Sequence, residues 1–253
     1  SSNDNLGDTF NGATSFNQHI GHWDVSNVVW MGSMFVGAQA FKSAFPGVVD
    51  TPTVQYFPYF NAAGNPINQD SIKTAVNAWI SNDIQAIITY GHISTWNTSA
   101  VTDMTELFKN KTTFNDDISN WDVSSVTDMS YMFFGAYAFN QNIGSWNVSS
   151  VANMIRMFSY ATVFNKDINT KEVTVDGNTY TAWNVSNVTN MNSVFHGASA
   201  FNQPIGDWNV SNVITMESTF RDATAFNQPI GDWDVSSNDN LGDTFNGATS
   251  FNQ

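Results

Sequence analysis

The sequence predicts an α/β solenoid with about 25 residues per turn and an α-helical cap segment. Three observations lead to this fold class: a tryptophan that recurs at a nearly constant step, two phenylalanine columns in register with it, and one amphipathic stretch outside the repeats. A unit of this length cannot bury its own apolar residues, so such units stack on copies of themselves.

Tryptophan sets the register of the repeats. It recurs at steps of 25, 25, 37, 25 and 25 residues, at Trp96, Trp121, Trp146, Trp183, Trp208 and Trp233. Twelve residues after each tryptophan position lies a phenylalanine, in the column Phe35, Phe108, Phe133, Phe158, Phe195, Phe220 and Phe245. Eighteen residues after it lies another, in the column Phe41, Phe114, Phe139, Phe164, Phe201, Phe226 and Phe251. We expect these columns to be buried, with like residues stacked on like.

Two segments of each repeat suggest regular structure. The V-S-N-V-T segment is rich in β-branched residues and predicts a short strand. The M-x-x-M-F-x-G-A segment has apolar residues three and four apart and predicts one or two turns of helix, closed by its glycine. Parallel pairing of the strands would give a rise of ~4.8 Å per turn.

The repeat FNQPIGDWNVSNV, followed by an M-x-x-hydrophobic-F-x-G-A segment, resembles that of BspA-type leucine-rich-repeat surface proteins. The stretch AVNAWISNDIQAIITYGHISTW is similar to the segment that often introduces such arrays. The resemblance implies a leucine-rich-repeat-like solenoid, an extracellular or cell-surface location, and roles in adhesion and interaction. Single turns depart from the pattern, for example at Asn110, Asp222 and Asn238.

The chain divides into four regions. We expect repeat turns that continue an array over 1–41, a proline-containing linker over 42–70, a cap helix over 71–95, and further repeat turns over 96–253 with a hairpin insertion near 169–182. The linker cannot be regular helix, because proline interrupts it at Pro46, Pro52, Pro58 and Pro66.

The cap segment is amphipathic. Asp70 or Ser71 is a suitable N-cap. The apolar stripe comprises Ile72, Val76, Trp79, Ile80, Ile84, Ile87 and Ile88. We expect this stripe to cover the end of the array next to Trp96, because a stack of repeats needs a cap.

The insertion carries a hairpin signal. Asp176-Gly177 suits a tight turn, and Val173 and Val175 alternate opposite Tyr180 and Thr181 as strand residues do. The hairpin is either a passive projection from one turn or a docking element for a partner.

The two ends of the chain share one sequence. Residues 1–18 are identical to residues 236–253, and a step of 25 from Trp233 leads, in a period of 235 residues, to Trp23. The internal repeats differ from one another at many positions, so this identity indicates a period of seven turns and one cap. The alternative is an artificially duplicated terminus.

Composition excludes several classes of function. Eight Lys and Arg against 22 Asp and Glu give a net charge of -14, which argues against binding nucleic acid or an anionic membrane. No apolar run approaches the ~20 residues of a membrane helix, so we expect no membrane insertion. The absence of cysteine excludes disulfides, thiolate metal sites and cysteine nucleophiles.

The sequence predicts no enzyme. It holds no H-E-x-x-H, G-x-S-x-G or P-loop motif, and Asp116 and Asp117 would point to opposite sides of an extended segment. We expect no catalytic, cofactor-binding or metal-binding residues, and no cofactor.

Two oxygen-rich stretches suggest half of a calcium loop, and both lack the bidentate glutamate of an EF-hand. They are Asn3-Asp4-Asn5 with Asp8, and Asn238-Asp239-Asn240 with Asp243. The favoured interpretation is a polar turn whose side chains bond their own backbone.

N-x-S/T sequons give candidate glycosylation sites, which would be used only on a eukaryotic secretory route. They lie at Asn97, Asn110, Asn147, Asn184, Asn187 and Asn209. Four follow a tryptophan directly, in a column where aspartate alternates with asparagine, so the column alternatively needs only a short polar side chain.

Three functions stay open at this point. The favoured one is a structural repeat unit of an extracellular filament or surface polymer, built from tandem or head-to-tail 235-residue periods that associate with one another end to end. The alternative is a cell-surface adhesin or binding module that recognises a protein or glycan. Aligned Ser and Thr also suggest an ice-binding ladder, but a flat T-x-T array is missing.

Overall fold

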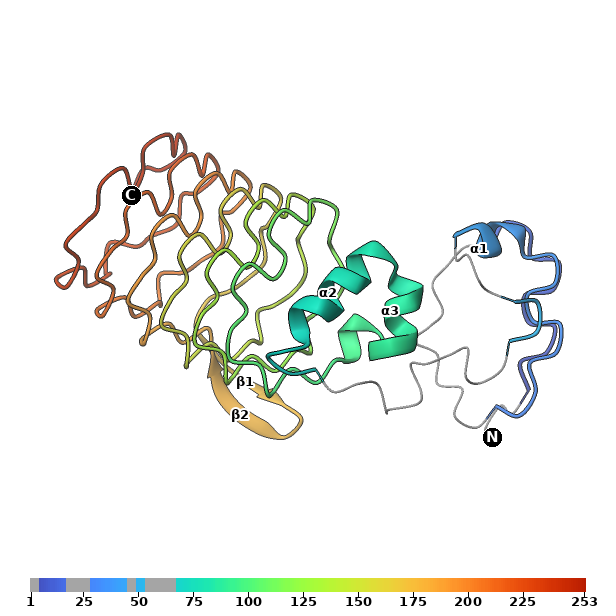
Figure 1. Cartoon of the computed structure of the whole chain (residues 1–253). Coiled ribbons are helices and arrows are strands. Elements are labelled where there is room, and N and C mark those ends of the chain that lie inside the picture. Colours follow the sequence, from blue (N-terminus) through green and yellow to red (C-terminus); the bar gives the residue numbers. More distant parts are fainter. Residues whose placement is uncertain (1–4, 17–27, 45–48, 53–66) are drawn as a thin grey trace. The chain divides into compact units, whose positions relative to one another are not determined.

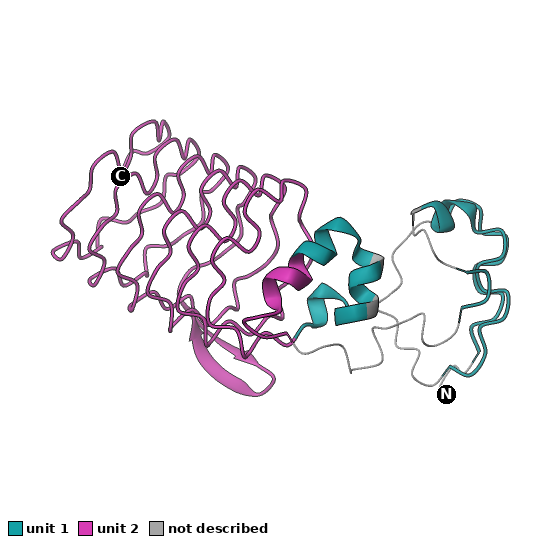
Figure 2. Cartoon of the chain, viewed as in Figure 1, with its two compact units in different colours: residues 1–66, 77–96 teal, residues 67–76, 97–253 magenta. Residues whose placement is uncertain are grey.

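A computed structural model describes residues 5–16, 28–44, 49–52 and 67–253. The chain forms two compact units, one from residues 1–66 and 77–96, the other from residues 67–76 and 97–253 (Figure 2). Among the described helices, none is both long and apolar enough to cross a membrane.

The larger unit is a row of stacked repeats (Figure 1). Each repeat forms one isolated parallel bridge with the next, at the same position of the repeat, in addition to further backbone hydrogen bonds. The bridge residues are Asp103, Asp128, Asn153, Asn190, Thr215 and Asn240.

The prediction of an α/β solenoid of leucine-rich-repeat type, with a strand and a helix in each turn, is wrong. Over the described residues the only strands are two antiparallel ones outside the repeats, and the repeats of 97–253 contain no helix. The V-S-N-V-T segment is a turn, closed in one repeat by the amide of Val126 on the carbonyl of Val123 at 2.9 Å.

Backbone geometry explains why the expected helix is missing. In residues 104–110 every second amide donates to the following repeat, as Met104 does to Asp128 and Phe108 to Met132, while Leu107 turns back to Met104. Glu106 lies between them with φ 62°, which is the left-handed region. Neither a helix nor a continuous strand tolerates this alternation, so the apolar spacing reflects single turns.

The core consists of the aromatic columns. Phe133 lies 5.5 Å from Phe158, ring centroid to ring centroid, and Phe158 lies 5.7 Å from Phe195, with the rings nearly parallel. Three stacked indoles inside the row, those of Trp146, Trp183 and Trp208, each donate to a backbone carbonyl, as Trp183 donates its Nε1–H to Ile143 at 2.8 Å. A buried N–H without an acceptor is costly, so this bond makes tryptophan acceptable in the core.

The segment expected to be one cap helix over 71–95 forms three short helices. They are α2 (Ile72–Ser81), α3 (Asp83–Tyr90) and the 3-10 helix η3 (Ile93–Thr95). Asn82 ends the first helix and caps the second, because its side chain accepts from the amide of Gln85 at 3.0 Å. Trp79 is buried and meets Trp96 edge to face at 6.2 Å.

Two further elements complete the described structure. Helix α1 (Gln39–Ala44) follows the turns of the repeat at 28–38. Strands β1 (Lys171–Val175) and β2 (Asn178–Ala182) form an antiparallel hairpin that projects from the row of repeats (Figure 1). Val173 pairs with Tyr180, with Asp176 and Gly177 in the turn between the strands.

Candidate functional site

The last repeat of the row has a backbone edge on which no other described residues stack. Its outward amides continue the pattern by which Met216 donates to Asn240 and Phe220 donates to Thr244. Among the described residues these outward amides have no hydrogen-bond partner. They belong to Leu241, Asp243, Phe245 and Gly247.

Apolar side chains are exposed at the same edge. Phe245 is 37% exposed, whereas the equivalent Phe220 one repeat earlier is 1% exposed. Leu241 is 48% exposed, and Phe251 is half-buried. We call the four outward amides and these three side chains the C-terminal edge.

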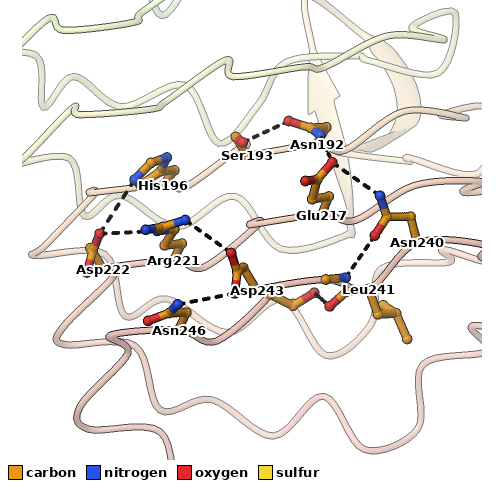
Figure 3. A network of polar contacts seen from close by, with 12 residues as sticks. Asn192, Ser193, His196, Glu217, Arg221, Asp222, Asn240, Leu241, Asp243 and Asn246 are labelled. Atoms are coloured by element: carbon orange, nitrogen blue, oxygen red, sulfur yellow. Dashed lines mark hydrogen bonds and ion pairs between the residues drawn. The ribbon is translucent and has the colours of Figure 1, made fainter.

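A polar network holds the last repeat in place (Figure 3). Arg221 donates from Nη1 to Asp243 at 3.1 Å, and Asn246 donates to the same carboxylate at 3.2 Å. Glu217 accepts from the amide groups of Asn240 at 3.2 Å and Asn192 at 3.1 Å. These bonds span three repeats, so they fix the side chains that flank the C-terminal edge.

His196 belongs to this network. Its ring Nε2 lies 3.5 Å from the carboxylate of Asp222. Burial lowers the pKa of His196 more than the Asp222 carboxylate raises it, and the charges of Arg221 and Arg156 lower it further. The histidine is therefore neutral near pH 7 and the contact with Asp222 is not an ion pair there.

At the other end of the row, a side chain covers the outer backbone groups of the first repeat. The Oε1 of Gln69 accepts from the amides of Thr102 at 3.0 Å and Asp103 at 2.8 Å. Its Nε2 donates to the carbonyl of Asp103 at 3.0 Å. Inside the row the amide of Thr127 donates to the carbonyl of Thr102, so the Gln69 amide takes the position of a preceding repeat.

Asp103 is the bridge residue of that first repeat. Burial would raise the pKa of Asp103, but hydrogen bonds from Thr105 and the positive charge of Lys73 outweigh burial and lower it. The carboxylate is therefore charged at neutral pH.

The sequence at the C-terminal edge occurs a second time, and there it is paired. Residues 5–16, the N-terminal copy, are identical to residues 240–251, the C-terminal copy. The amides of the N-terminal copy donate to the repeat at 28–44, from Leu6 to Trp30, Asp8 to Gly32, Phe10 to Met34 and Gly12 to Val36. The four donors correspond one for one to the four outward amides of the C-terminal edge.

A pocket of about 300 Å³ lies beneath the hairpin and is a second candidate. Asp122, Asn147, Asp176, Asn178 and Tyr180 contribute to its lining. The phenol of Tyr180 donates to the carbonyl of Ser145 at 2.6 Å and so ties the hairpin to the repeats. Burial and the negative charges of Asp122 and Asp176 raise the pKa of this phenol.

The sequon asparagines fall into two groups. Asn97, Asn147, Asn184 and Asn209 each accept with Oδ1 from the amide of the serine two residues on. Asp122 makes the same bond to Ser124 at 2.9 Å, so a short polar side chain closes this turn whether or not it is asparagine. Asn110 and Asn187 are exposed, and the amide of Asn187 donates to the carbonyl of Ser149 at 2.7 Å.

The oxygen-rich stretches form polar turns where they are described. Asn238 accepts from the amide of Asn240 at 3.0 Å, and Asn240 accepts from the amide of Gly242 at 2.9 Å. Asn3 and Asp4 lie outside the described residues. Across 5–16, 28–44, 49–52 and 67–253, no cluster of three His, Asp or Glu has the arrangement of a metal site.

Comparison with known proteins gives one family. Neither the curated proteins nor the solved structures yield a match. A family profile described as "Mycoplasma protein of unknown function, DUF285" matches three times, over residues 1–75, 74–178 and 170–253, and together these matches span the whole chain. The chain therefore belongs to the DUF285 family.

Proposed function

We propose that the chain is a structural repeat unit of an extracellular filament or surface polymer, in which 235-residue periods follow one another end to end. One observation carries this proposal: residues 240–251 are identical to residues 5–16, whose four outward amides pair with residues 28–44. The next period thus begins with a segment that fits the edge at which the previous period ends.

The row is suited to joining in one direction only. Its first repeat is occupied by the Gln69 amide, whereas no described residue accepts from the outward amides of its last repeat. An open edge of unpaired amides and exposed phenylalanine invites pairing with another chain. The partner repeat would come either from a further period of the same polypeptide or from a separate subunit, and the surface that it covers is the same in both cases.

Net charge supports thin filaments. Each chain carries a charge of -14, so neighbouring filaments would repel one another laterally while the short-range contacts at the ends persist. The extracellular location is proposed from the resemblance to BspA-type surface proteins.

The test is sedimentation velocity of the purified chain over a concentration series, with negative-stain images of the same samples. We expect the mass to rise with concentration and thin linear particles to appear. Compact monomers at every concentration would contradict end-to-end association of separate chains.

A second candidate is an adhesin that binds a protein or glycan. The observation that favours it is the polar pocket beneath the hairpin, where Asp122, Asp176 and Tyr180 line one hollow. Glycan-array binding that disappears in the variant Tyr180→Ala, with the variant still folded, would favour this candidate.

A further inference from the structure

Three aromatic side chains and one arginine form a surface cluster on the second and third repeats of the row. We call this cluster the aromatic patch, and its members are Tyr131, Phe134, Arg156 and Tyr160. We propose that the aromatic patch binds a protein partner through an acidic side chain that stands among apolar ones on that partner. This function goes beyond the proposed filament, because the aromatic patch lies within the row and not at either of its ends.

The members of the aromatic patch contact one another across the two repeats. The ring of Phe134 lies 5.7 Å from that of Tyr131 and 5.7 Å from that of Tyr160, centroid to centroid. The Cζ of Arg156 lies 5.7 Å from the centre of the Tyr131 ring, a distance at which a cation is attracted to an aromatic face. The ring of His196 follows Tyr160 at 4.9 Å and joins the aromatic patch to the polar network (Figure 3). The cluster is therefore one continuous surface.

The equivalent positions in the other repeats of the row carry polar side chains. The position of Phe134 holds Lys109, Ser159, His196, Arg221 and Asn246. The position of Tyr131 holds Glu106, Arg156, Ser193, Ser218 and Asp243. Stacking of the repeats therefore does not require aromatic rings at these two positions. Partly exposed tyrosine, phenylalanine and arginine are instead enriched where proteins bind one another.

The backbone of Tyr160 adopts a conformation that disfavours a large side chain. Its φ is 59°, in the left-handed region, and the side chain is 39% exposed. Its equivalents in the row are glycine or a short polar residue, which tolerate this conformation. They are Asn110, Gly135, Gly197, Asp222 and Gly247. Tyrosine is thus present against the local backbone preference, and such strain is typical of functional sites.

The next repeat provides space for the Tyr160 ring. A Cβ atom at Gly197 would lie 2.6 Å from the Cδ1 of Tyr160, so any side chain there would displace the ring. The hydroxyl of Tyr160 also lies 3.3 Å from the Nε2 of His196. The ring is therefore held in place before a partner arrives, which lowers the entropy cost of binding.

Arg156 gives the aromatic patch its charge. None of the described acidic side chains forms an ion pair with it, and its buried Nε has no hydrogen-bond acceptor among the described residues. Arg221, two repeats later, pairs with Asp222 and Asp243. In a chain with 22 Asp and Glu, an arginine without such a partner favours a carboxylate from another molecule, which a guanidinium binds through two parallel hydrogen bonds.

Charge and shape favour a protein over other acidic partners. The net charge of -14 repels polyanions such as nucleic acids and highly charged glycans. The Phe134 ring is inclined by 50° to that of Tyr131 and by 83° to that of Tyr160, so the rings offer no common plane on which a series of bases could stack. An uneven surface of tyrosine and arginine matches the residues that dominate binding between proteins. The partner therefore presents an isolated carboxylate between apolar side chains.

Selection of random peptides displayed on phage tests this proposal, with the full chain immobilised and the selected peptides measured by biolayer interferometry. We expect these peptides to carry Asp or Glu next to an aromatic or aliphatic residue. Arg156→Gln should weaken their binding about tenfold, because the charged hydrogen bonds are lost. Ile214→Thr is the control: it replaces an exposed apolar residue outside the aromatic patch by the residue found at Thr189, and it should leave binding unchanged.

A second variant separates binding from stability. Tyr160→Gly introduces the residue of the equivalent positions Gly135 and Gly197. It should weaken peptide binding about tenfold, because an exposed ring of the aromatic patch is lost. It should leave the melting temperature unchanged or raise it, because glycine adopts the left-handed conformation without strain.

Three results would overturn the proposal. The first is that no acidic peptide is selected, or that the selected peptides bind Arg156→Gln and Tyr160→Gly as tightly as the wild type. The second is a lower melting temperature for Tyr160→Gly, which would show that this ring serves the stability of the row. The third is binding of an acidic glycan that Arg156→Gln abolishes, which would assign the aromatic patch to a glycan. Each leaves the filament proposal untouched, because sedimentation of the wild type tests that proposal separately.

Discussion

The two ends of the row at 97–253 present the same backbone pattern and satisfy it in different ways. At the first repeat, one glutamine side chain accepts two amide hydrogen bonds and donates a third, in the place of a preceding repeat. At the last repeat, the outward amides meet no partner among the described residues, and Phe245 is 37% exposed. The two ends of this stack of similar repeats therefore differ because Gln69, a residue outside the repeats, closes one of them.

The hydrogen-bonding groups on the outer side of the first repeat are thus satisfied, whereas those of the last repeat have no described partner. A primary amide reproduces one donor and one acceptor of a peptide group, so Gln69 ends the ladder locally without another repeat. Nothing comparable stands before Leu241 or Phe245 in the described structure. We expect the interior of the row, its closed end and its open end to contribute differently to stability.

The largest effect is expected in the interior column. Phe133→Ala removes a fully buried ring that stacks on Phe108 and Phe158, and it should lower the free energy of unfolding by about 3–5 kcal/mol. Phe245→Ala at the open end is the matched control and should cost much less, because Phe245 is half out of the core. Urea denaturation followed by circular dichroism measures both. Equal losses would show that the open end is packed like the interior.

The next effect concerns the buried indole N–H groups. Trp183→Phe removes a fully buried hydrogen bond to the carbonyl of Ile143, which keeps the amide of Trp146 as its other donor at 3.1 Å. The lost bond and the smaller ring together should cost about 1–3 kcal/mol. Trp233→Phe removes the equivalent bond to Ile205 from a half-buried tryptophan near the open end and should cost less. The same denaturation experiment compares them. A larger loss for Trp233→Phe would contradict the ranking.

The closed end should respond to a single side chain. Gln69→Ala removes four hydrogen bonds and should destabilise the larger unit by about 1–2 kcal/mol, because the site is only partly buried. Gln253→Ala is its control at the open end, where the side chain makes one exposed bond to Asn227 at 2.9 Å. Hydrogen exchange at Thr102 and Asp103 reports the change directly. Unchanged protection of these two amides would show that Gln69 does not close the row.

The sequence predicts the register of the repeats but not the backbone conformation of each repeat. Periodic Trp and Phe columns mark buried positions because only apolar side chains suit a stacked core, and Phe133, Phe158 and Phe195 are fully buried. The same M-x-x-M-F spacing is produced by a helix and by successive turns. Side-chain spacing alone therefore does not distinguish them, and the left-handed φ at Glu106 has no signal in its residue type.

The candidate site was partly readable from the sequence. Identity of residues 1–18 and 236–253 indicates that the two ends fit the same neighbour. The role of Gln69 was not readable, because a lone glutamine in a polar loop carries no pattern. Its contacts with Thr102 and Asp103 join residues more than thirty positions apart, and only the folded backbone brings them together.

The smallest expected effect depends on pH. The pKa of His196 lies below its ordinary value of 6.5 in the folded chain, so the unfolded chain binds its proton first as the pH falls. The contribution of His196 is present above pH 6.5 and is lost as the pH falls through its folded pKa. Melting temperatures of the wild type and His196→Gln, measured from pH 7.5 to pH 5, should show a steeper decrease for the wild type. Parallel curves would contradict this assignment.

The most direct test of the account is hydrogen exchange at the C-terminal edge as a function of protein concentration. The amides of Leu241, Asp243, Phe245 and Gly247 should exchange rapidly in dilute solution, because none of the described residues accepts a hydrogen bond from them. At concentrations where the chain associates, these four amides should become protected together, while the interior amide of Phe133 keeps its protection throughout. Association without any protection of the four amides would contradict the claim that this edge joins one period to the next.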